Sequence, residues 1–265
     1  MQSNKEFSLL LFNVDSNLNT LLHLACKKKS AKIFRLVLSF IIENRGPYLN
    51  LISQKNSKSE SFFQIACNQG CIEIMNSFLN ERVNFMPNYD PFIEHDESLN
   101  TPLLSSILNE QYQSVLFLLN NGANVNIENE NKQNALHLSC ITSSYEITEC
   151  LLRHGCNYLS QDKDKMYPFC YACKNGNEEI VKLMLNLSDA HLFVNSRPFD
   201  LSIENGHSGV TDILLRSKHW KRMMLYDENS SIKKMIQKMV KDFSFEFNFH
   251  AKLKKIVFFF PQYLK

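Results

Sequence analysis

The hydrophobic positions of this chain repeat one pattern six times along its 265 residues. Each copy holds a short, mostly apolar stretch, a Gly or polar turn, and a second apolar stretch that ends in a Leu pair or a similar pair. The copies begin at Thr20, Ser61, Thr101, Asn134, Tyr167 and Arg197, so the successive spacings are 41, 40, 33, 33 and 30 residues. Because the apolar residues recur at helical spacing, the pattern predicts two short helices in every copy.

A small residue occupies the same place in every first stretch, where a neighbouring helix must approach closely. These residues are Ala25, Ala66, Ser106, Ser139, Ala172 and Ser202. One helix pair cannot bury its apolar face alone, so the repetition predicts an all-α solenoid in which each pair packs on the next. The seven Gly and seven Pro are too few for a turn-rich all-β fold.

The repeated phrase resembles the ankyrin repeat, whose signature includes T-P-L-H-x-A. Residues 101–103 read TPL, residues 136–138 read LHL, and residues 118–126 read LLNNGANVN, which matches the family's helix end and hairpin entry. The match is closest in units three to five, because units one and two lack the Pro and carry insertions around residues 44–55 and 84–96. The resemblance implies an ankyrin-type solenoid of stacked helix-turn-helix repeats with hairpin loops.

The same alignment predicts the domain organisation. Residues 1–14 are expected to form an N-terminal cap segment, and residues 15–217 the ankyrin repeat domain. Its six units are expected to start near residues 15, 56, 96, 129, 162 and 192. Residues 218–265 would then be a helical or irregular C-terminal extension that caps the other end.

The C-terminal extension is basic and aromatic. Residues 216–265 hold 12 Lys/Arg and 4 Asp/Glu, a net charge of +8, which leaves 17 and 23, a net of −6, for residues 1–215. The apolar residues of IKKMIQKMVKD, from residue 232, recur at helical spacing, and residues 243–249 alternate Phe with other residues. Capping is the favoured role. Contact of residues 218–265 with a partner or an anionic membrane comes second, and contact with nucleic acid is the least favoured.

The cysteines have a packing explanation. Four of the eight, Cys26, Cys67, Cys140 and Cys173, directly follow the small residue of the first stretch, and Cys is a small residue that is commonly buried. Cys170 and Cys173 have the spacing of a zinc or redox half-site, but no second CxxC or His pair accompanies them. We therefore expect no metal and no cofactor.

The remaining chemistry points away from catalysis. The resemblance implies that His23, His137 and His207 are structural, with His23 and His137 hydrogen-bonding backbone in the adjoining turn. The chain has no phosphate-cradling glycine loop and no nucleophile elbow. We expect a non-enzymatic protein. The longest apolar run of the tail, residues 256–261, is too short to span a bilayer, so we expect a cytoplasmic protein, with the nucleus as the alternative.

The resemblance also implies where a protein partner binds, because ankyrin partners dock on the concave side at hairpin tips and at exposed ends of the first helices. The hairpin candidates are Glu130, Asn131, Gln133, Lys163, Asp164 and Met166. The helix-end candidates are Lys27, Lys28, Asn68, Gln69, Leu108, Asn109, Ile141, Thr142, Lys174, Asn175, Glu204 and Asn205. Leu108 and Ile141 are apolar at a usually polar position of adjacent units, which indicates either an interaction patch or half-burial against the next unit.

Two further hypotheses remain open at this stage. The insertion around residues 84–96 carries Met86, Tyr89 and Phe92, which could form a protruding recognition loop, although a tolerated insertion is the simpler account. The favoured function is binding of a protein partner on the concave surface by a monomeric, non-catalytic module. The alternative is an adaptor whose tail recruits a second component, either ubiquitin-ligase machinery or an anionic membrane.

Overall fold

The computed structural model describes residues 11–187 and 197–217 and divides the chain into two compact units, residues 1–172 and 173–265. Each unit is described by itself. Within the described residues the secondary structure is helical, apart from one isolated β-bridge between Lys55 and Ser61. The all-α repeat fold expected from the sequence is confirmed. The predictions for residues 1–10 and for residues 218–265 concern segments that lie outside the described residues.

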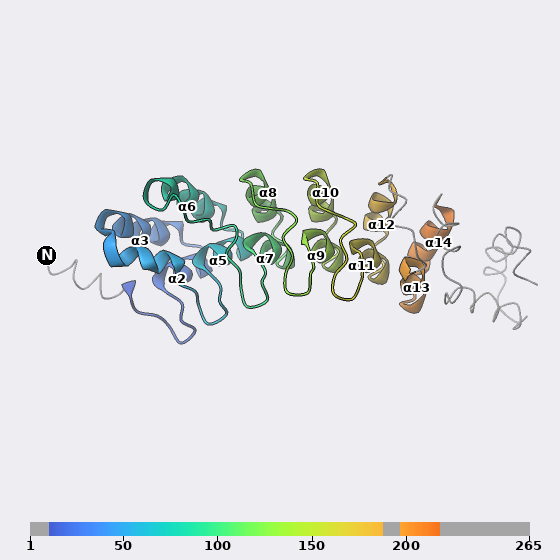
Figure 1. Ribbon diagram of the computed structural model, residues 1–265, viewed down its shortest axis with the longest axis horizontal. Helices are drawn as coiled ribbons and strands as arrows, with labels where there is room; N and C mark the ends of the chain where they lie inside the picture. Colours follow the sequence, from blue (N-terminus) through green and yellow to red (C-terminus); the bar gives the residue numbers. More distant parts are fainter. Residues whose placement is uncertain (1–10, 188–196, 218–265) are drawn as a thin grey trace, which may run out of the picture. The chain divides into compact units, whose positions relative to one another are not determined.

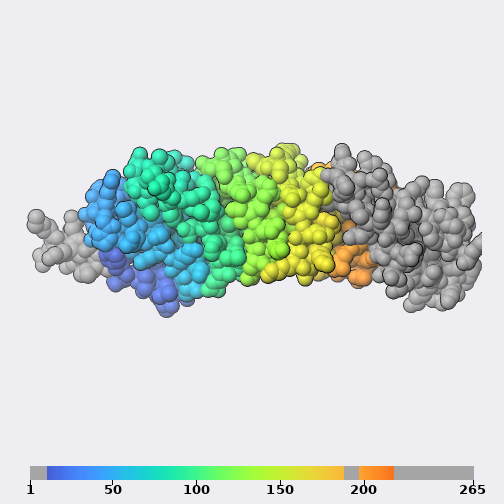
Figure 2. All heavy atoms as spheres, viewed as in Figure 1, coloured from blue at the N-terminus to red at the C-terminus, as the bar shows by residue number. Residues whose placement is uncertain are grey.

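The described part of unit 1, residues 11–172, contains four helix pairs in two rows. The inner row holds α2 (Leu21–Lys27), α5 (Phe62–Asn68), α7 (Pro102–Leu108) and α9 (Ala135–Ile141). The outer row holds α3 (Ala31–Asn44), α6 (Ile72–Phe85), α8 (Tyr112–Asn120) and α10 (Tyr145–Arg153). Figure 1 shows the hairpin loops leaving the inner row on the side away from the outer row. In the space-filling view, the successive helix pairs of unit 1 form a continuous surface on the face shown (Figure 2).

The other described helices lie between and after these pairs. The 3₁₀-helix η1 (Gly46–Leu49) and the short helix α4 (Asn50–Ser53) follow α3, and α11 (Pro168–Lys174) crosses the boundary between the units. Unit 2 holds α12 (Glu178–Leu185), α13 (Arg197–Glu204) and α14 (Ser208–Arg216), with α14 packed on both α12 and α13.

The turn between the two helices of a pair uses a left-handed residue in every unit described. Gly70, Gly176 and Gly206 have φ of 69° to 75°, and Lys29, Glu110 and Ser143 have φ of 52° to 59° at the equivalent positions. Glycine enters this conformation without steric cost, whereas a residue with a Cβ is strained there. Each described helix pair is therefore joined by a turn that passes through the same backbone conformation.

The insertions of the first two units lengthen the outer helices. Helices α3 and α6 have 14 residues, whereas α8 and α10 have 9. Part of the extra length of these two repeats is therefore helical. The added helical turns continue the apolar face of α3 to Ile41 and of α6 to Phe85, both of which are buried.

The core of unit 1 is aromatic between α3, α5 and α6. The rings of Phe34 and Phe62 are 5.5 Å apart, and the ring of Phe78 lies 4.9 Å from Phe62 and 5.8 Å from Phe63. All four side chains are fully buried, and each buried ring contributes roughly 1.5–3 kcal/mol of hydrophobic stabilisation.

No helix in the described parts of the chain is both long enough and apolar enough to cross a bilayer.

Candidate functional site

Five hairpins of unit 1 share one turn, built on an Asp or Asn side chain. The Oδ1 atom of this residue accepts hydrogen bonds of 2.9–3.0 Å from the backbone N–H groups two and four residues later. The turn residues are Asp15, Asn56, Asp96, Asn129 and Asp162. Such side chains replace the backbone acceptor of an ordinary turn, so each hairpin reaches the same shape without a glycine.

The tip of each hairpin is strained. Three residues after the turn Asp or Asn, the backbone is left-handed, with φ of 57° to 59° in all five copies. The residues at this position are Leu18, Ser59, Leu99, Lys132 and Lys165. Each carries a Cβ, so each holds this conformation at a cost of about 1 kcal/mol or more.

A histidine of the first repeat forms a hydrogen bond with the hairpin of the second repeat. His23 accepts from the backbone N–H of Thr20 at Nδ1 (3.2 Å), and its Nε2 donates to the carbonyl oxygen of Glu60 (3.1 Å). His137 repeats the link, because its Nε2 donates to the carbonyl oxygen of Met166 at 3.0 Å. Burial lowers the pKa of both imidazoles, which favours the neutral form. The structural role expected for these two histidines is the one that they have in unit 1.

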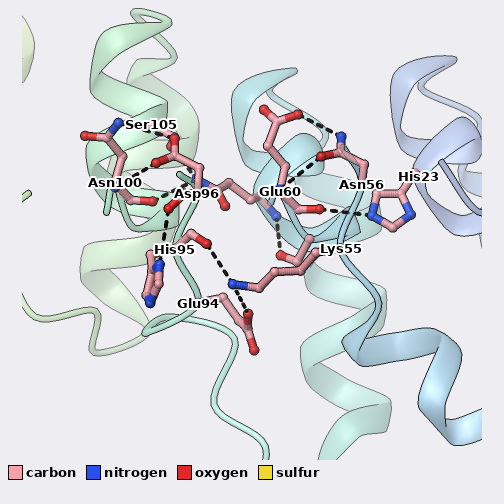
Figure 3. Close-up of polar contacts among 11 residues, drawn as sticks. His23, Lys55, Asn56, Glu60, Glu94, His95, Asp96, Asn100 and Ser105 are labelled. Carbon is pink, nitrogen blue, oxygen red and sulfur yellow. Dashed lines mark hydrogen bonds and ion pairs between the residues drawn. The ribbon is translucent and has the colours of Figure 1, made fainter. Parts of the chain in front are cut away.

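Gln64 occupies the equivalent place in the second repeat and makes the same link. Its Nε2 donates to the carbonyl oxygen of Asn100 at 2.8 Å and to Ser105 Oγ at 2.6 Å. In all three cases the acceptor carbonyl belongs to the residue just before the helix N-cap of the next unit. Figure 3 shows this region, with His23 and Glu60 on one side and Asn100 and Ser105 on the other.

Backbone bonds join neighbouring hairpins directly. The N–H of Ser57 donates to Asn17 (2.9 Å), and that of Lys163 to Asn131 (3.0 Å). A third bond runs from Glu130 N–H to the Ser98 carbonyl at 3.0 Å.

Side chains add links between the same loops. The Asn56 amide donates to Asn19 Oδ1, and the Asn129 amide to Asn100 Oδ1, both at 3.2 Å. Between the second and third hairpins, Lys55 Nζ contacts the His95 carbonyl at 2.7 Å and Glu94 at 3.2 Å (Figure 3). The five hairpins therefore form one connected row.

Comparison with protein families agrees with this geometry. A family model described as ankyrin repeats (3 copies) matches residues 64–162, 108–196 and 136–223, together more than half of the chain. The chain belongs to the ankyrin repeat family. A search of curated proteins finds no match. Ankyrin repeats generally mediate protein–protein interactions and are typically non-catalytic.

Most of the candidate contact residues of this ankyrin protein lie at the surface. The exposed ones are Lys27, Lys28, Leu108, Asn109, Glu130, Asn131, Lys163, Asp164, Lys174, Asn175, Glu204 and Asn205. The half-buried ones are Asn68, Gln69, Gln133, Ile141 and Thr142. Leu108 is 42% exposed, whereas Ile141 is half-buried, so the two members of the expected apolar pair differ. Partner contact by these residues stays a prediction.

Met166 is the exception, and its assignment to the exposed surface is wrong. Its side chain is only 4% exposed. The residue precedes a helix N-cap, and its backbone is fixed at both ends: its N–H donates to Asp162 Oδ1 (2.9 Å) and its carbonyl accepts from His137. The hairpin position therefore turns the Met166 side chain into the core, away from a partner.

The aromatic insertion does not form a protruding loop. The ring of Tyr89 lies 6.1 Å from that of Phe78, and the ring of Phe92 lies 6.1 Å from that of Phe63. The Arg82 guanidinium donates to the Tyr89 carbonyl. Burial raises the pKa of the Tyr89 phenol. The insertion is thus an apolar strap on α5 and α6, although Ile93 remains exposed.

Sequence reasoning missed two apolar residues at the hairpin tips. Leu18 is 52% exposed and Leu99 is 44% exposed, and both lie at the strained left-handed position. The available signal was their place three residues after Asp15 and Asp96, where a turn of this kind favours glycine or a polar residue. Together with Leu108, Leu99 places apolar surface on the hairpin and inner helix of the same unit.

The cysteines are inert in this setting. All eight are buried, and burial raises the pKa of Cys140 and raises that of Cys156 to about 12. Cys170 and Cys173 lie on α11 with almost no exposed area. Within residues 11–187 and 197–217, no cluster of three His, Cys, Asp or Glu side chains is arranged to hold a metal ion.

Proposed function

We propose that this ankyrin repeat protein binds a protein partner through the hairpin tips and inner-helix ends of unit 1, and that it does so without catalysis. The observation that carries the proposal is the connected row of hairpins. Its five turns have the same backbone shape, while the residues at their tips differ in charge and apolarity. A rigid scaffold with variable exposed side chains is how loops commonly carry recognition.

The strained leucines support the same surface. Leu18 and Leu99 combine two unfavourable features, an exposed apolar side chain and a left-handed backbone. Backbone strain of this kind clusters at functional positions, and exposed apolar residues mark interaction patches. Leu99 and Leu108 are therefore the residues that we expect to contribute most to binding, since few residues of an interface dominate its energy. The surrounding Lys, Glu and Asn side chains would supply the polar rim.

An adaptor role is the second candidate. The observation in its favour is the sequence of the tail, which concentrates 12 Lys/Arg against 4 Asp/Glu in residues 216–265. Such a segment suits an acidic partner, including a component of the ubiquitin-ligase machinery, or an anionic membrane, where each basic residue adds about 1 kcal/mol. In that case the repeats would select one partner and the tail would recruit another.

Affinity capture with two forms of the protein separates the two candidates. The full chain and residues 1–218 are used as bait at low and moderate salt, and the captured proteins are identified by mass spectrometry. A partner held by both forms supports recognition by the repeats. A partner lost with the tail, from a truncated protein that is still helical by circular dichroism, would favour the adaptor.

A further inference from the structure

The turn between the first two paired helices carries four lysines, here called the lysine cluster. Lys27, Lys28, Lys29 and Lys32 lie at the end of α2 and the start of α3, and all four residues are exposed. Within the described residues, none of the four makes an ion pair. The cluster stands in a part of the chain, residues 1–215, that holds 17 Lys/Arg against 23 Asp/Glu, a net charge of −6. It is therefore a local positive patch on an acidic body.

Lysine is unfavourable at the turn position itself. Lys29 has φ of 52°, and glycine takes this place in three of the other turns, at Gly70, Gly176 and Gly206. A residue with a Cβ is strained in this conformation, whereas glycine is not. The fold would thus be better served by glycine at position 29.

Lysine is also unfavourable at the start of α3. Lys32 is the second residue of this helix, where the positive end of the helix dipole disfavours a cation. The equivalent residue in three other second helices is an acid, namely Glu73 of α6, Glu146 of α10 and Glu179 of α12. The first repeat therefore reverses the charge that suits this position.

Two nearby carboxylates are already engaged and leave the lysine cluster strongly positive. Lys27 acts electrostatically on Asp15, but the Asn19 amide already donates to both oxygens of that carboxylate, at 3.0 and 2.8 Å. Glu73 is paired with Arg35, one helical turn beyond Lys32, at 2.6 Å. Exposed lysines that are kept where they weaken the fold point to a negatively charged ligand, because such strain clusters at functional positions.

The lysine cluster follows the same row of inner helices as the exposed Leu108. Lys28 directly follows α2 and Leu108 ends α7, and α5 packs between these two helices (Figure 1). Neighbouring helix axes are about 8–10 Å apart, so two steps along the row span about 16–20 Å. An extended peptide covers this span with about five or six residues.

We propose that the lysine cluster binds an acidic segment of the protein partner, and that an apolar side chain about five or six residues further along this segment contacts Leu108. The inference rests on the proposed function, because it names the chemistry of the partner at the same surface. A short acidic segment fits better than a nucleic acid or a membrane, since either of these would extend its negative charge over the acidic remainder of residues 1–215.

Peptide selection on the full chain tests the proposal with a defined probe. A phage-displayed library of random peptides of roughly twelve residues, long enough for the span, is selected on the native protein. The enriched peptides are synthesised, and their affinity is measured by fluorescence anisotropy. We expect an acidic run about five or six residues from an apolar residue, and affinity that falls with salt.

The variant Lys29→Gly/Lys32→Glu separates binding from folding. It relieves the turn and suits the helix dipole, so it should raise the melting temperature by roughly 2–4 °C. It should nevertheless weaken the enriched peptides about fivefold or more, because their carboxylates lose two cationic partners and meet a new anion. The control Lys29→Arg/Lys32→Arg keeps both charges and should bind within about twofold of the native protein.

Three results would overturn the proposal. The first is a selection that enriches no peptide above the input library, or only peptides without acidic residues. The second is an acidic peptide whose affinity is the same for the native protein and for Lys29→Gly/Lys32→Glu. The third is weaker binding of phosphatidylserine vesicles or of a single-stranded oligonucleotide by that variant with unchanged peptide affinity, which would assign the lysine cluster to a lipid or a nucleic acid.

Leu108→Glu distinguishes failure of this inference from failure of the proposed function. Enriched peptides that lack acidic residues but are weakened by Leu108→Glu would leave the proposed surface in place and refute only the acidic segment. Peptides that neither Leu108→Glu nor Lys29→Gly/Lys32→Glu weakens would refute both.

Discussion

His23 Nε2 donates a hydrogen bond to the carbonyl oxygen of Glu60, 37 residues further along the chain, at 3.1 Å. The bond joins the inner helix of one unit to the hairpin of the next. Gln64 and His137 make the corresponding bonds to Asn100 and Met166. The repeated apolar phrase therefore contains, besides packing residues, one polar side chain that positions the neighbouring hairpin.

Replacing His23 should show which property of its side chain matters. We expect that a side chain long enough to donate a hydrogen bond to the Glu60 carbonyl matters more than the imidazole ring itself. His23→Ala removes one of two hydrogen bonds to the Glu60 carbonyl, which keeps the one from the Asn56 N–H, and leaves the Thr20 N–H without its acceptor. This loss should lower the free energy of unfolding by about 1–3 kcal/mol. His23→Gln should lose clearly less, because Gln64 makes this link with an amide. Urea unfolding followed by circular dichroism measures both. Equal losses for Ala and Gln would contradict the positioning role.

The same histidines should make stability depend on pH. Burial lowers the folded-state pKa of His23 and His137 from the ordinary value of 6.5. Below pH 6.5 the unfolded chain binds protons that the folded chain does not. The free energy of unfolding is therefore unaffected by these histidines above pH 6.5, and it decreases as the pH falls toward their lowered pKa in the folded state.

Urea midpoints between about pH 7.5 and about pH 5.5 should record this decline, in the window where only histidines change charge readily. The double variant His23→Gln/His137→Gln should show a shallower slope over the same range. A native slope that is flat, or one that the double variant leaves unchanged, would be evidence against buried neutral imidazoles.

A glycine at a hairpin tip should stabilise the protein. Lys132 has φ of 58°, a conformation that costs a residue with a Cβ about 1–2 kcal/mol. Lys132→Gly removes that cost but adds entropy to the unfolded chain, so we expect a net gain of about 0.5–1 kcal/mol. Lys132→Ala keeps the Cβ and should give no such gain. If Ala and Gly give the same urea midpoint, the tip is not strained.

Asn129 should tolerate Asp far better than Ala. Its Oδ1 accepts from the N–H groups of Asn131 and Gln133 at 3.0 Å, and Asp fills this role at positions 96 and 162. Asn129→Ala removes both acceptor contacts and should cost about 2 kcal/mol or more. Asn129→Asp keeps them and loses the two amide hydrogen bonds to Asn100 and Gln133. Thermal unfolding of the two variants ranks them, and a more stable Ala variant would refute the turn assignment.

The fold could be predicted from the sequence because several features recur together in successive repeats. The helical spacing, the small residue of the inner helix and the 33-residue period all predict the same stacked pairs. The length of α3 and α6 was not predicted, because residues inserted after a helix can extend it or form a loop, and the choice depends on packing. At α6, burial of Phe85 next to Phe78 (6.5 Å) favours extension.

The candidate site was predictable in position but not in detail. Exposure of Leu108 follows from its place at the end of an inner helix. The inward direction of Met166, and the packing of Tyr89 and Phe92 on α5 and α6, depend on contacts with residues distant in the sequence. The exposure of Leu99 depends on the left-handed backbone at its turn, which the Asp96 side chain imposes three residues earlier.

Binding of a captured partner to two single variants tests the central claim most directly. Leu108→Glu changes an exposed leucine on the inner row, and Val83→Glu changes an exposed apolar residue on the outer row that is 63% exposed. Calorimetry should show at least a tenfold weaker partner affinity for Leu108→Glu, corresponding to about 1.4 kcal/mol, and an unchanged affinity for Val83→Glu. If both variants are folded and Leu108→Glu binds as well as the native protein while Val83→Glu does not, recognition lies on the outer face and the account is wrong.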